Sequence, residues 1–218
     1  MPKKRKQKLA IIGAGLLGEQ IARSAAKNDY QVVGFYDDVK TGFNEKTGQP
    51  ILGKTKDIEA DFKLKKFDCL MIGVGYTLLK ERRCIFEKFK GKVPFARVIH
   101  HSCQIDESVE LGEGIYLMAG TILDAGVTLK DNVLCNVGCV VAHDSIIGAH
   151  SFLGPRVTVA GKSTIGQACF IGVGATIMDL IKVGDNAIIG AGAVVTNNIP
   201  SASLAVGVPA KVKRKLKV

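Results

Sequence analysis

The chain has 218 residues, 47% of them hydrophobic, and a formal net charge of +10 at pH 7. This length suits one large or two modest domains, and no apolar run reaches the roughly 18 residues that a transmembrane helix needs. A basic surface attracts phosphate groups, but with no Trp, four Tyr and nine Phe the composition disfavours recognition of nucleic acid by base stacking.

The N-terminus is basic and then apolar, as in a signal peptide. Its apolar run is short, contains a glycine-rich turn and lacks an Ala-x-Ala cleavage site, so we expect residues 3–6 to be a solvated tail. The six Cys include no C-x-x-C pair, and four of them lie at or near core-facing repeat positions described below, where Cys behaves as a small hydrophobic residue. A reduced, cytoplasmic protein is expected. These four are Cys103, Cys135, Cys139 and Cys169.

The first motif along the chain is a glycine-rich turn between a predicted strand and a predicted helix. The pattern G-x-G-x-x-G occupies residues 13–18, and a second strand over residues 31–36 ends in Asp37 and Asp38. In a dinucleotide-binding βαβ unit such glycines let the backbone approach a phosphate at a helix N-terminus, and a carboxylate about 20 residues later meets a ribose hydroxyl. We expect a nucleotide site here; the alternative is that these glycines only form tight turns.

The following segments complete a small α/β domain. Residues 55–64 are expected to be partly helical, residues 67–74 to form a strand, and a helix is expected from about Thr77, which suits the N-cap position. A last strand is expected near residues 94–99. About four strands in about 95 residues are half of a doubly wound fold, which suits a mononucleotide better than NAD.

Ligands of open α/β sheets bind at the carboxyl ends of the strands, so we expect the strand ends at Gly13, Asp37 and Gly75 to converge at one edge. Arg82 and Arg83 lie on the helix after the third strand. Either is a candidate to meet a diphosphate, although a solvated helix face explains at least one of them.

A six-residue period organises residues 99–200. Every sixth residue is aliphatic or Cys without a break in phase, a second register two residues earlier is small or aliphatic at most steps, and Gly often follows the sixfold position. This period predicts a solenoid in which each hexad supplies a short strand and a corner; a β-sandwich would lose the phase at its loops. The sixfold residues are Ile99, Ile105, Leu111, Leu117, Leu123, Leu129, Cys135, Val141, Ile147, Leu153, Val159, Ile165, Ile171, Ile177, Val183, Ile189 and Val195.

One His among the four in the chain combines with an acidic neighbour. His143 lies two residues after the inward-facing Val141, which places it at a corner or on the outside, and Asp144 follows it directly. A neutral imidazole can accept a proton from an amine or hydroxyl, and a nearby carboxylate fixes its tautomer and stabilises the imidazolium. His143 and Asp144 are therefore a candidate catalytic pair; the alternative is a polar surface pair.

The order of these motifs resembles one family. A small nucleotide-binding domain precedes the hexads, N-V-G-C-V-V-A-H-D-S-I-I-G-A-H stands at residues 136–150, and V-G-V-P-A-K at residues 206–211. From about Leu9 to Lys211 the chain resembles the hexapeptide-repeat nucleotide-sugar acetyltransferases of the sialic-acid and bacillosamine type. The resemblance implies an α/β half-Rossmann domain, residues 1–97, followed by a left-handed parallel β-helix, residues 98–218. The handedness comes from the resemblance alone, because the general preference is for right-handed crossovers.

The resemblance also implies roles for single residues. His143 is the general base, with Asp144 raising its basicity, and acetyl-CoA lies in a groove between the β-helices of adjacent subunits in a homotrimer. No metal is expected. The implied nucleotide-sugar site is Gly13, Ala14, Gly15, Asp37 and Asp38, to which the predicted strand end adds Gly75 and Tyr76. The implied acetyl-CoA site is Phe152, Gly161, Gly172, Val173, Gly190, Ala191, Pro209 and Lys211.

Two positions depart from the family pattern. Family members typically carry a second His nine residues after the base, where it contacts the acetyl carbonyl, but this chain has Phe152 there, and His150 is two residues out of register. The glycine-rich loop of some relatives also contains a His, where this chain has Leu16 and Leu17. Both departures concern how the acceptor is oriented and which acceptor is used, and neither concerns the base.

These features together predict an acetyl-CoA-dependent N-acetyltransferase. The expected acceptor is a nucleotide-linked amino-deoxysugar, acetylated at a C4 amino group, for bacterial lipopolysaccharide or O-antigen; no nucleic-acid partner and no membrane insertion are expected. An O-acetyltransferase would need the same base and groove. A NAD-dependent oxidoreductase leaves the hexads unexplained, a γ-type carbonic anhydrase needs three zinc-binding His, and a non-catalytic nucleotide-binding scaffold leaves His143 and Asp144 unexplained.

Overall fold

A computed structural model describes residues 5–28 and 30–217, so Lys3 and Lys4 of the expected tail lie outside the described residues. The chain divides into two compact units, residues 1–101 and 102–218, and each is described by itself. The functional roles expected of the two domains stay predictions at this point.

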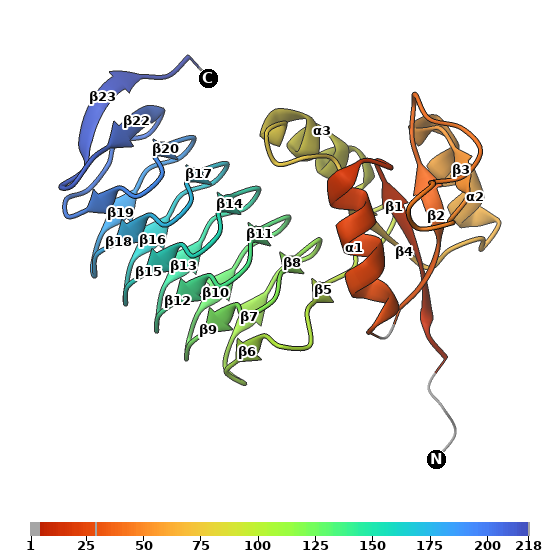
Figure 1. Cartoon of the computed structure of the whole chain (residues 1–218), viewed down its shortest axis with the longest axis horizontal. Coiled ribbons are helices and arrows are strands. Elements are labelled where there is room, and N and C mark those ends of the chain that lie inside the picture. Colours follow the sequence, from red (N-terminus) through yellow and green to blue (C-terminus); the bar gives the residue numbers. More distant parts are fainter. Residues whose placement is uncertain (1–4, 29, 218) are drawn as a thin grey trace. The chain divides into compact units, whose positions relative to one another are not determined.

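The first unit is built on a four-stranded sheet with the order β3-β2-β1-β4 (Figure 1). The pairings of β1 with β2, β1 with β4 and β2 with β3 are all parallel. This is the strand order of one half of a doubly wound fold, as expected. The elements are β1 (Gln7–Ile12), α1 (Leu16–Ala26), β2 (Tyr30–Tyr36), β3 (Ile51–Gly53), the 3-10 helix η1 (Thr55–Asp57), α2 (Ile58–Lys63), β4 (Cys69–Ile72), α3 (Leu79–Phe89) and β5 (Val98–Ile99).

Apolar strands and aromatic rings form the core of this unit. Strand β4 is buried along its whole length although it is the last strand of the sheet, because Phe95 forms an isolated parallel bridge with Leu70 along its outer edge. Tyr36 at the end of β2 packs edge to face on Phe67, with ring centroids 5.8 Å apart, and Phe86 of α3 stacks on Phe95 at 4.5 Å. These rings belong to one buried cluster that also contains Ile72, the last residue of β4.

The structure corrects three expectations in this unit. Strand β3 was not predicted, and the strand expected near residues 94–99 is only β5. Helix α3 begins at Leu79 with Leu78 as its N-cap and no side-chain cap, so the assignment of Thr77 to that position is wrong.

Arg82 does not face a ligand. It is 2% exposed, and its Nη1 donates hydrogen bonds to the carbonyls of Ile72 at 3.0 Å and Val74 at 2.8 Å. Burial lowers the pKa of its guanidinium to about 10. Arg82 therefore ties α3 to the end of β4, which rules out the suggested diphosphate contact, whereas Arg83 is exposed.

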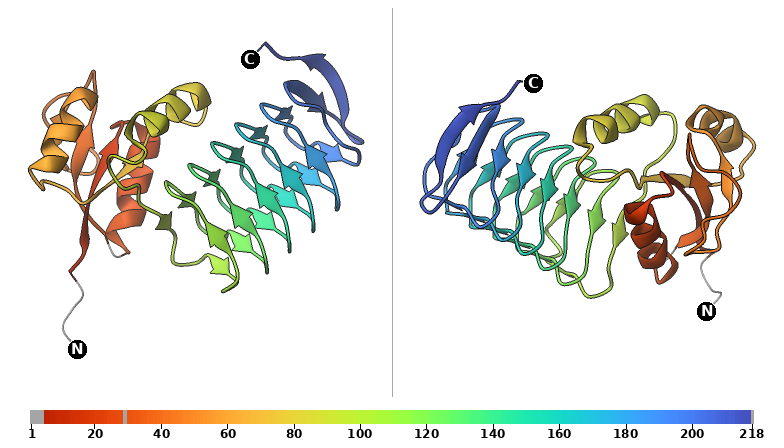
Figure 2. Two further views of the ribbon diagram at one scale, coloured as in Figure 1. Left: turned by 180° about the vertical axis from the view of Figure 1, so that it is seen from behind. Right: turned by 45° about the horizontal axis from the view of Figure 1, so that its top comes forward.

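The second unit is a parallel β-helix in which each hexad gives a two-residue strand. Paired strands are 18 residues apart, as in Val140 opposite Thr158, so three hexads make one coil (Figures 1 and 2). Every predicted sixfold residue of this unit is the second residue of its strand. The strands are β6 (Gln104–Ile105), β7 (Glu110–Leu111), β8 (Tyr116–Leu117), β9 (Ile122–Leu123), β10 (Thr128–Leu129), β11 (Leu134–Cys135), β12 (Val140–Val141), β13 (Ile146–Ile147), β14 (Phe152–Leu153), β15 (Thr158–Val159), β16 (Thr164–Ile165), β17 (Phe170–Ile171), β18 (Thr176–Ile177), β19 (Lys182–Val183), β20 (Ile188–Ile189) and β21 (Val194–Val195).

Three sheets form the faces of the coil, and each is named here by its first strand in this unit. The β6 sheet has the order β21-β18-β15-β12-β9-β6, and the β7 sheet β19-β16-β13-β10-β7. The β8 sheet runs from β8 through β11, β14, β17 and β20 to β22 (Ser203–Val206) and β23 (Lys211–Lys215). Strand β23 is antiparallel to β22 and ends the solenoid.

The corners repeat as regularly as the strands. One residue in each hexad from Gly114 to Gly192 is left-handed, with φ between 52° and 72°. Glycine adopts this conformation without cost, but Asp144 (φ 57°) and Leu180 (φ 62°) adopt it as well. The left-handed position therefore follows from the geometry of the coil and not from glycine alone.

Glycines that follow the sixfold residues have a packing role. A Cβ on Gly172 would lie 2.6 Å from Ala191 N of the next coil, and a Cβ on Gly166 would lie 2.6 Å from Asp185 N. Adjacent strands stack at about 4.8 Å, which leaves no room for a side chain at these points. The recurring Gly in the hexads is thus explained by stacking.

Candidate active site

The glycine-rich loop after β1 uses its three glycines differently. Gly13 has φ 96°, and a Cβ on Gly18 would lie 2.1 Å from Gly13 O. By contrast, a Cβ on Gly15 would meet no atom within 4 Å. Gly13 therefore makes the turn, Gly18 lets α1 pack on the loop, and the backbone at Gly15 is open, which are the roles that phosphate-binding loops of this fold require.

Two amide groups of this loop already have partners. Gly13 N donates to Tyr36 O at 2.8 Å, and Ala14 N donates to Asp37 Oδ2 at 2.9 Å. Helix α1 starts at Leu16 with Gly15 as N-cap and no side-chain cap. The N–H groups left to meet an anion are therefore those at the beginning of α1.

Asp37 and Asp38 are both held by local contacts. Oδ1 of Asp37 accepts from the N–H groups of Val39 at 3.0 Å and Lys40 at 2.9 Å. Burial acts to raise the pKa of Asp37, but the three N–H contacts hold it below its usual value. Asp38 accepts from Oγ1 and N of Thr55, which lowers its pKa. Since a carboxylate has about four acceptor positions, Asp37 keeps one for a ligand.

The third strand end reaches the glycine-rich loop at Gly73 and not at Gly75. Gly73 N donates to Ile12 O at 2.7 Å, and a Cβ on Gly73 would lie 2.6 Å from Gly18 Cα. Gly75 and Tyr76 follow in the open loop, with Tyr76 39% exposed. Gly73 was missed by the sequence analysis, although its position at a strand end was a signal.

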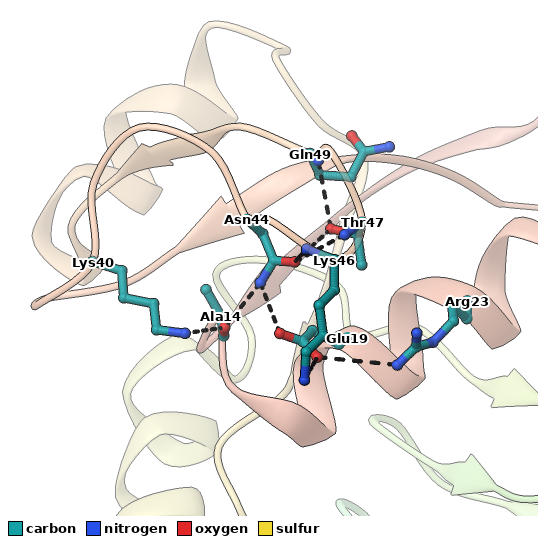
Figure 3. Close-up of polar contacts among 8 residues, drawn as sticks. All are labelled: Ala14, Glu19, Arg23, Lys40, Asn44, Lys46, Thr47 and Gln49. Carbon is teal, nitrogen blue, oxygen red and sulfur yellow. Dashed lines mark hydrogen bonds and ion pairs between the residues drawn. The ribbon is translucent and has the colours of Figure 1, made fainter.

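Lys40 and Asn44 were also missed. Both lie in the loop after β2, and both side chains donate to the carbonyl of Ala14 (Figure 3). The sequence offered a weak signal, a Lys and an Asn soon after the acidic pair.

In the second unit, His143 and Asp144 form a pair at the corner between β12 and β13. His143 Nδ1 lies 3.0 Å from Asp144 Oδ2, and the two side chains are 53% and 57% exposed. A carboxylate oxygen can only accept, so Nδ1 donates and Nε2 carries the lone pair.

Gly161, one coil beyond His143, lies directly against the imidazole. A Cβ at this position would come within 2.6 Å of Nε2 and 2.8 Å of Cε1 of His143. Only glycine therefore leaves the ring where it is. The structure thus brings His143, Asp144 and Gly161 together.

Buried serines support this corner from the inside. Ser145 Oγ donates to Ala160 O at 3.0 Å and accepts from Ser163 N at 3.2 Å. Ser163 Oγ repeats the pattern one coil later, donating to Met178 O at 2.8 Å and accepting from Ile181 N at 3.2 Å. These hydroxyls satisfy turn groups that would otherwise be buried without partners.

Four further residues of the expected acetyl-CoA site lie on another corner. Gly172 and Val173 join β17 to β18, and Gly190 and Ala191 join β20 to β21, so all four stack at the corner between the β8 and β6 sheets. The corner of His143 lies between the β6 and β7 sheets. Within one chain the β6 sheet therefore separates the two groups.

Phe152 and His150 are both buried. Phe152, in β14 of the β8 sheet, is 2% exposed and packs on Phe170 with ring centroids 5.0 Å apart. His150 is 5% exposed, and its Nδ1 lies 3.1 Å from Asn132 Nδ2. The structure thus brings neither Phe152 nor His150 to the corner of His143.

The end of the chain places cationic side chains on both faces of β23. Pro209 is exposed in the turn before β23, and Lys211 is paired with Val206. An irregularity in the ladder then pairs Arg214 with Leu204. Since Leu204 and Val206 face outward and paired residues share a face, Lys211 and Arg214 lie together on the outside of the β8 sheet.

Comparison with known proteins decides the family. The PglD N-terminal domain matches residues 8–89, and the bacterial transferase hexapeptide (six repeats) matches residues 162–197. PerB from Caulobacter crescentus, solved with CoA and GDP-perosamine, is 30% identical with a TM-score of 0.85, over 95% of this chain and 97% of PerB. The chain belongs to the hexapeptide-repeat nucleotide-sugar acetyltransferases. The expected half-Rossmann domain and left-handed β-helix are confirmed.

A second solved structure agrees with the family. The acetyltransferase domain of PglB from Neisseria gonorrhoeae, solved with acetyl coenzyme A, is 32% identical to this acetyltransferase, with a TM-score of 0.87 over 95% of this chain and 99% of that domain. WeeI from Acinetobacter baumannii shares the fold at 24% identity and a TM-score of 0.57, over 94% and 98%. No curated protein sequence matches the chain.

In the part of the chain that the structure describes, no helix is long and apolar enough to cross a membrane. Within the same residues, His, Cys, Asp and Glu form no group of three placed to hold a metal ion.

Proposed function

We propose that this acetyltransferase transfers the acetyl group of acetyl-CoA to the C4 amino group of a nucleotide-linked 4-amino-4,6-dideoxysugar. The observation that carries the proposal is the His143–Asp144 pair, with Nε2 of His143 turned toward Gly161, in a chain similar along its length to PerB, which was solved with CoA and GDP-perosamine. Two further structures of that perosamine N-acetyltransferase carry Asn or Ala in place of one histidine.

His143 acts as the general base. Nε2 accepts a proton from the sugar amine as its nitrogen attacks the thioester carbonyl, and Asp144 stabilises the imidazolium through Nδ1–H. The tetrahedral intermediate then breaks its C–S bond, and the imidazolium returns the proton to the departing thiolate of CoA. One N–C bond forms and one C–S bond breaks, so His143 ends the cycle neutral.

The backbone N–H of Gly161 is the proposed donor to the oxyanion. In the described part of the chain, no group accepts a hydrogen bond from it, whereas Gly161 O accepts from Leu180 N at 3.1 Å. An amide already fixed in position stabilises a developing negative charge without reorganisation.

The nucleotide sugar is proposed to bind the glycine-rich loop. The first unit carries 21 Lys and Arg against 11 Asp and Glu, and the second carries nine of each. All the excess positive charge thus lies in the domain proposed to hold the diphosphate, where it favours an anionic substrate. The Gly15 N–H, the N–H groups at the start of α1 and the remaining acceptor position of Asp37 are the proposed contacts, since the N–H and carbonyl groups of Ala14 already have partners.

Acetyl-CoA is proposed to bind between two copies of the chain in a homotrimer. His143 and Gly161 lie on one corner of the β-helix and Val173 and Ala191 on another, so a groove between neighbouring copies can combine one corner from each. Lys211 and Arg214, which share an outward face, are proposed to meet the 3′-phosphate. A cytoplasmic location and a role in bacterial surface glycans such as lipopolysaccharide or O-antigen complete the proposal.

The function is tested by incubating the purified protein with acetyl-CoA and GDP-, UDP- or dTDP-linked 4-amino-6-deoxysugars while free thiol is measured. Thiol release with at least one of them, and an N-acetyl product identified by mass spectrometry and NMR, is the expected result. No release with any of the three series, or acetyl found on a hydroxyl oxygen, would overturn it, and the second result would favour the O-acetyltransferase.

A further inference from the structure

The carbonyl oxygen of Ala14 accepts two hydrogen bonds from the loop after β2. Lys40 Nζ donates to it at 2.9 Å and Asn44 Nδ2 at 3.1 Å, and Figure 3 shows both side chains reaching the start of α1 from the same loop. Two side chains thus converge on one peptide unit of the glycine-rich loop. Neither Lys40 nor Asn44 was among the site residues expected from the sequence.

The peptide that they hold is the one that joins Ala14 to Gly15. In a trans peptide the carbonyl oxygen and the following N–H point in opposite directions. Lys40 and Asn44 therefore fix the Gly15 N–H on the far side from themselves. Nothing in the described residues accepts a hydrogen bond from this N–H, and the space beside Gly15 is open.

Because Gly15 restricts the rotation of this peptide only weakly, neighbouring side chains must fix its orientation. Its dihedral angles are φ −86° and ψ −171°, but a glycine adopts positive φ about as readily, so the Ala14–Gly15 peptide can rotate. Rotation would present the carbonyl oxygen, with its partial negative charge, where the N–H now stands. A phosphate would then be repelled and not bound.

Asn44 is itself held in one orientation. It is 4% exposed, and its Oδ1 accepts from Lys46 N at 3.1 Å and from N and Oγ1 of Thr47 at 3.0 Å. The Nδ2 group donates to Glu19 Oε1 at 3.1 Å as well as to Ala14. The side-chain amide therefore cannot exchange its two ends without losing these bonds.

Glu19 is a buried carboxylate in the first turn of α1. It is 5% exposed, the hydrogen bond from Asn44 lowers its pKa, and its Oε2 accepts no hydrogen bond among the described residues. Lys46 Nζ at 3.5 Å and Arg23 Nη2 at 4.0 Å supply the opposite charge to Oε2. A negative charge beside a diphosphate site opposes anion binding. The role of Glu19 in orienting Asn44 accounts for the presence of this carboxylate at the site.

We propose that Lys40 and Asn44, with Glu19 orienting Asn44, are positioning residues that keep the Ala14–Gly15 peptide turned with its N–H toward the diphosphate of the nucleotide sugar. This inference rests on the proposed function, because it assigns a role within the nucleotide-sugar site. The three side chains act on the ligand through one backbone amide.

The test measures the Kd of GDP, UDP and dTDP by calorimetry for the wild type and for variants. We expect Lys40→Met to weaken the diphosphate that binds best by about tenfold, the loss typical of a charge-assisted hydrogen bond, with unchanged affinity for CoA. Lys40→Arg, which keeps a charged donor, should restore binding to within about threefold. Lys63→Met removes the same charge from an exposed position on α2 and should leave the Kd unchanged.

A double variant distinguishes positioning from a direct phosphate contact. Asn44→Ala removes the donor to Ala14 and to Glu19 without placing a second carboxylate beside Glu19. If both residues act through one peptide, Lys40→Met will weaken binding by at most about twofold further in the Asn44→Ala background. A full tenfold weakening by Lys40→Met in the Asn44→Ala variant, or no weakening by Lys40→Met in the wild-type background, would overturn the inference. A wild type that binds none of the three diphosphates would overturn the proposed function as well.

Discussion

At the scale of single residues, the catalytic proposal depends on one imidazole and its two neighbours. Asp144 holds Nδ1 of His143 at 3.0 Å, and Gly161 leaves only hydrogen atoms beside Nε2. The Asp144 carboxylate thereby orients the imidazole at Nδ1, and the absence of a side chain at Gly161 leaves the space that the ring needs at Nε2. Each neighbour can be tested separately from the base itself.

Replacing His143 by Ala removes the base and keeps the corner. We expect kcat to fall by about 10² to 10⁴, the usual contribution of a general base, while the Kd of CoA stays within about threefold of the wild type. Steady-state kinetics and calorimetry measure the two quantities. Turnover close to the wild-type rate would show that another group takes the proton.

Adding one methyl group to Gly161 should also slow the reaction. The Cβ of Gly161→Ala would lie 2.6 Å from Nε2, so the imidazole must rotate away. Because misplacement of a catalytic group by about 1 Å can cost about 10²-fold, we expect kcat to fall at least tenfold, with little change in the KM of the nucleotide sugar. Gly120→Ala, whose Cβ would be 3.8 Å from its nearest neighbour, is the control. Equal kcat values for the two variants would contradict this role.

At the scale of elements, the hexad is the unit that explains both the fold and the corners. Its sixfold residue is buried from Leu117 onward, the next residue is Gly where the neighbouring coil leaves no room, and one residue per corner is left-handed. The proposed catalytic pair on such a corner is fixed by the coils before and after it. Ala125 O accepts from Asp144 N, and Lys162 N donates to His143 O, both at 2.9 Å.

The inward serines of the corner should contribute measurably to stability. Ser163→Ala removes the partner of two turn groups, Met178 O and Ile181 N, and a buried polar group without a partner costs about 1 to 3 kcal/mol. We expect the free energy of unfolding to fall by that amount in urea titrations at one fixed protein concentration. The exposed Ser201→Ala is the control. A change of less than about 0.5 kcal/mol for Ser163→Ala would match an ordinary surface substitution and refute the role.

At the scale of the whole molecule, the residues expected to bind acetyl-CoA lie on two corners that the β6 sheet separates. A site that uses both corners needs either a cofactor that crosses this sheet or a second copy of the chain. In the proposed homotrimer, the second corner comes from another copy of the chain. Complementation between two inactive variants can therefore distinguish the homotrimer from a chain that forms a complete site alone.

Two inactive variants should restore activity when they are mixed. His143→Ala lacks the base on one corner, and Ala191→Trp blocks the exposed surface of the other. Since a shared site takes one corner from each copy, co-refolded mixtures should regain about a quarter of wild-type turnover, the share of sites in which both corners are intact. A mixture no more active than its components would show that each chain completes its own site. A wild-type protein that sediments as a monomer and is fully active would also show that each chain completes its own site.

The sequence by itself determined the period of the solenoid and the order of the two folds, and it singled out His143 and Asp144 as the candidate catalytic pair, because these depend on local spacing. A six-residue repeat can bury its aliphatic residues only by stacking, and a glycine-rich turn between a strand and a helix has few structural solutions. Only the tertiary structure decided what contacts what across long separations. It turned Arg82 inward onto β4, gave Gly172 a stacking role, set Gly161 against His143, and brought Lys40 and Asn44 to the Ala14 carbonyl. These contacts join residues 10 to 30 positions apart, and their geometry depends on how coils, loops and strands pack, which spacing along the chain does not record.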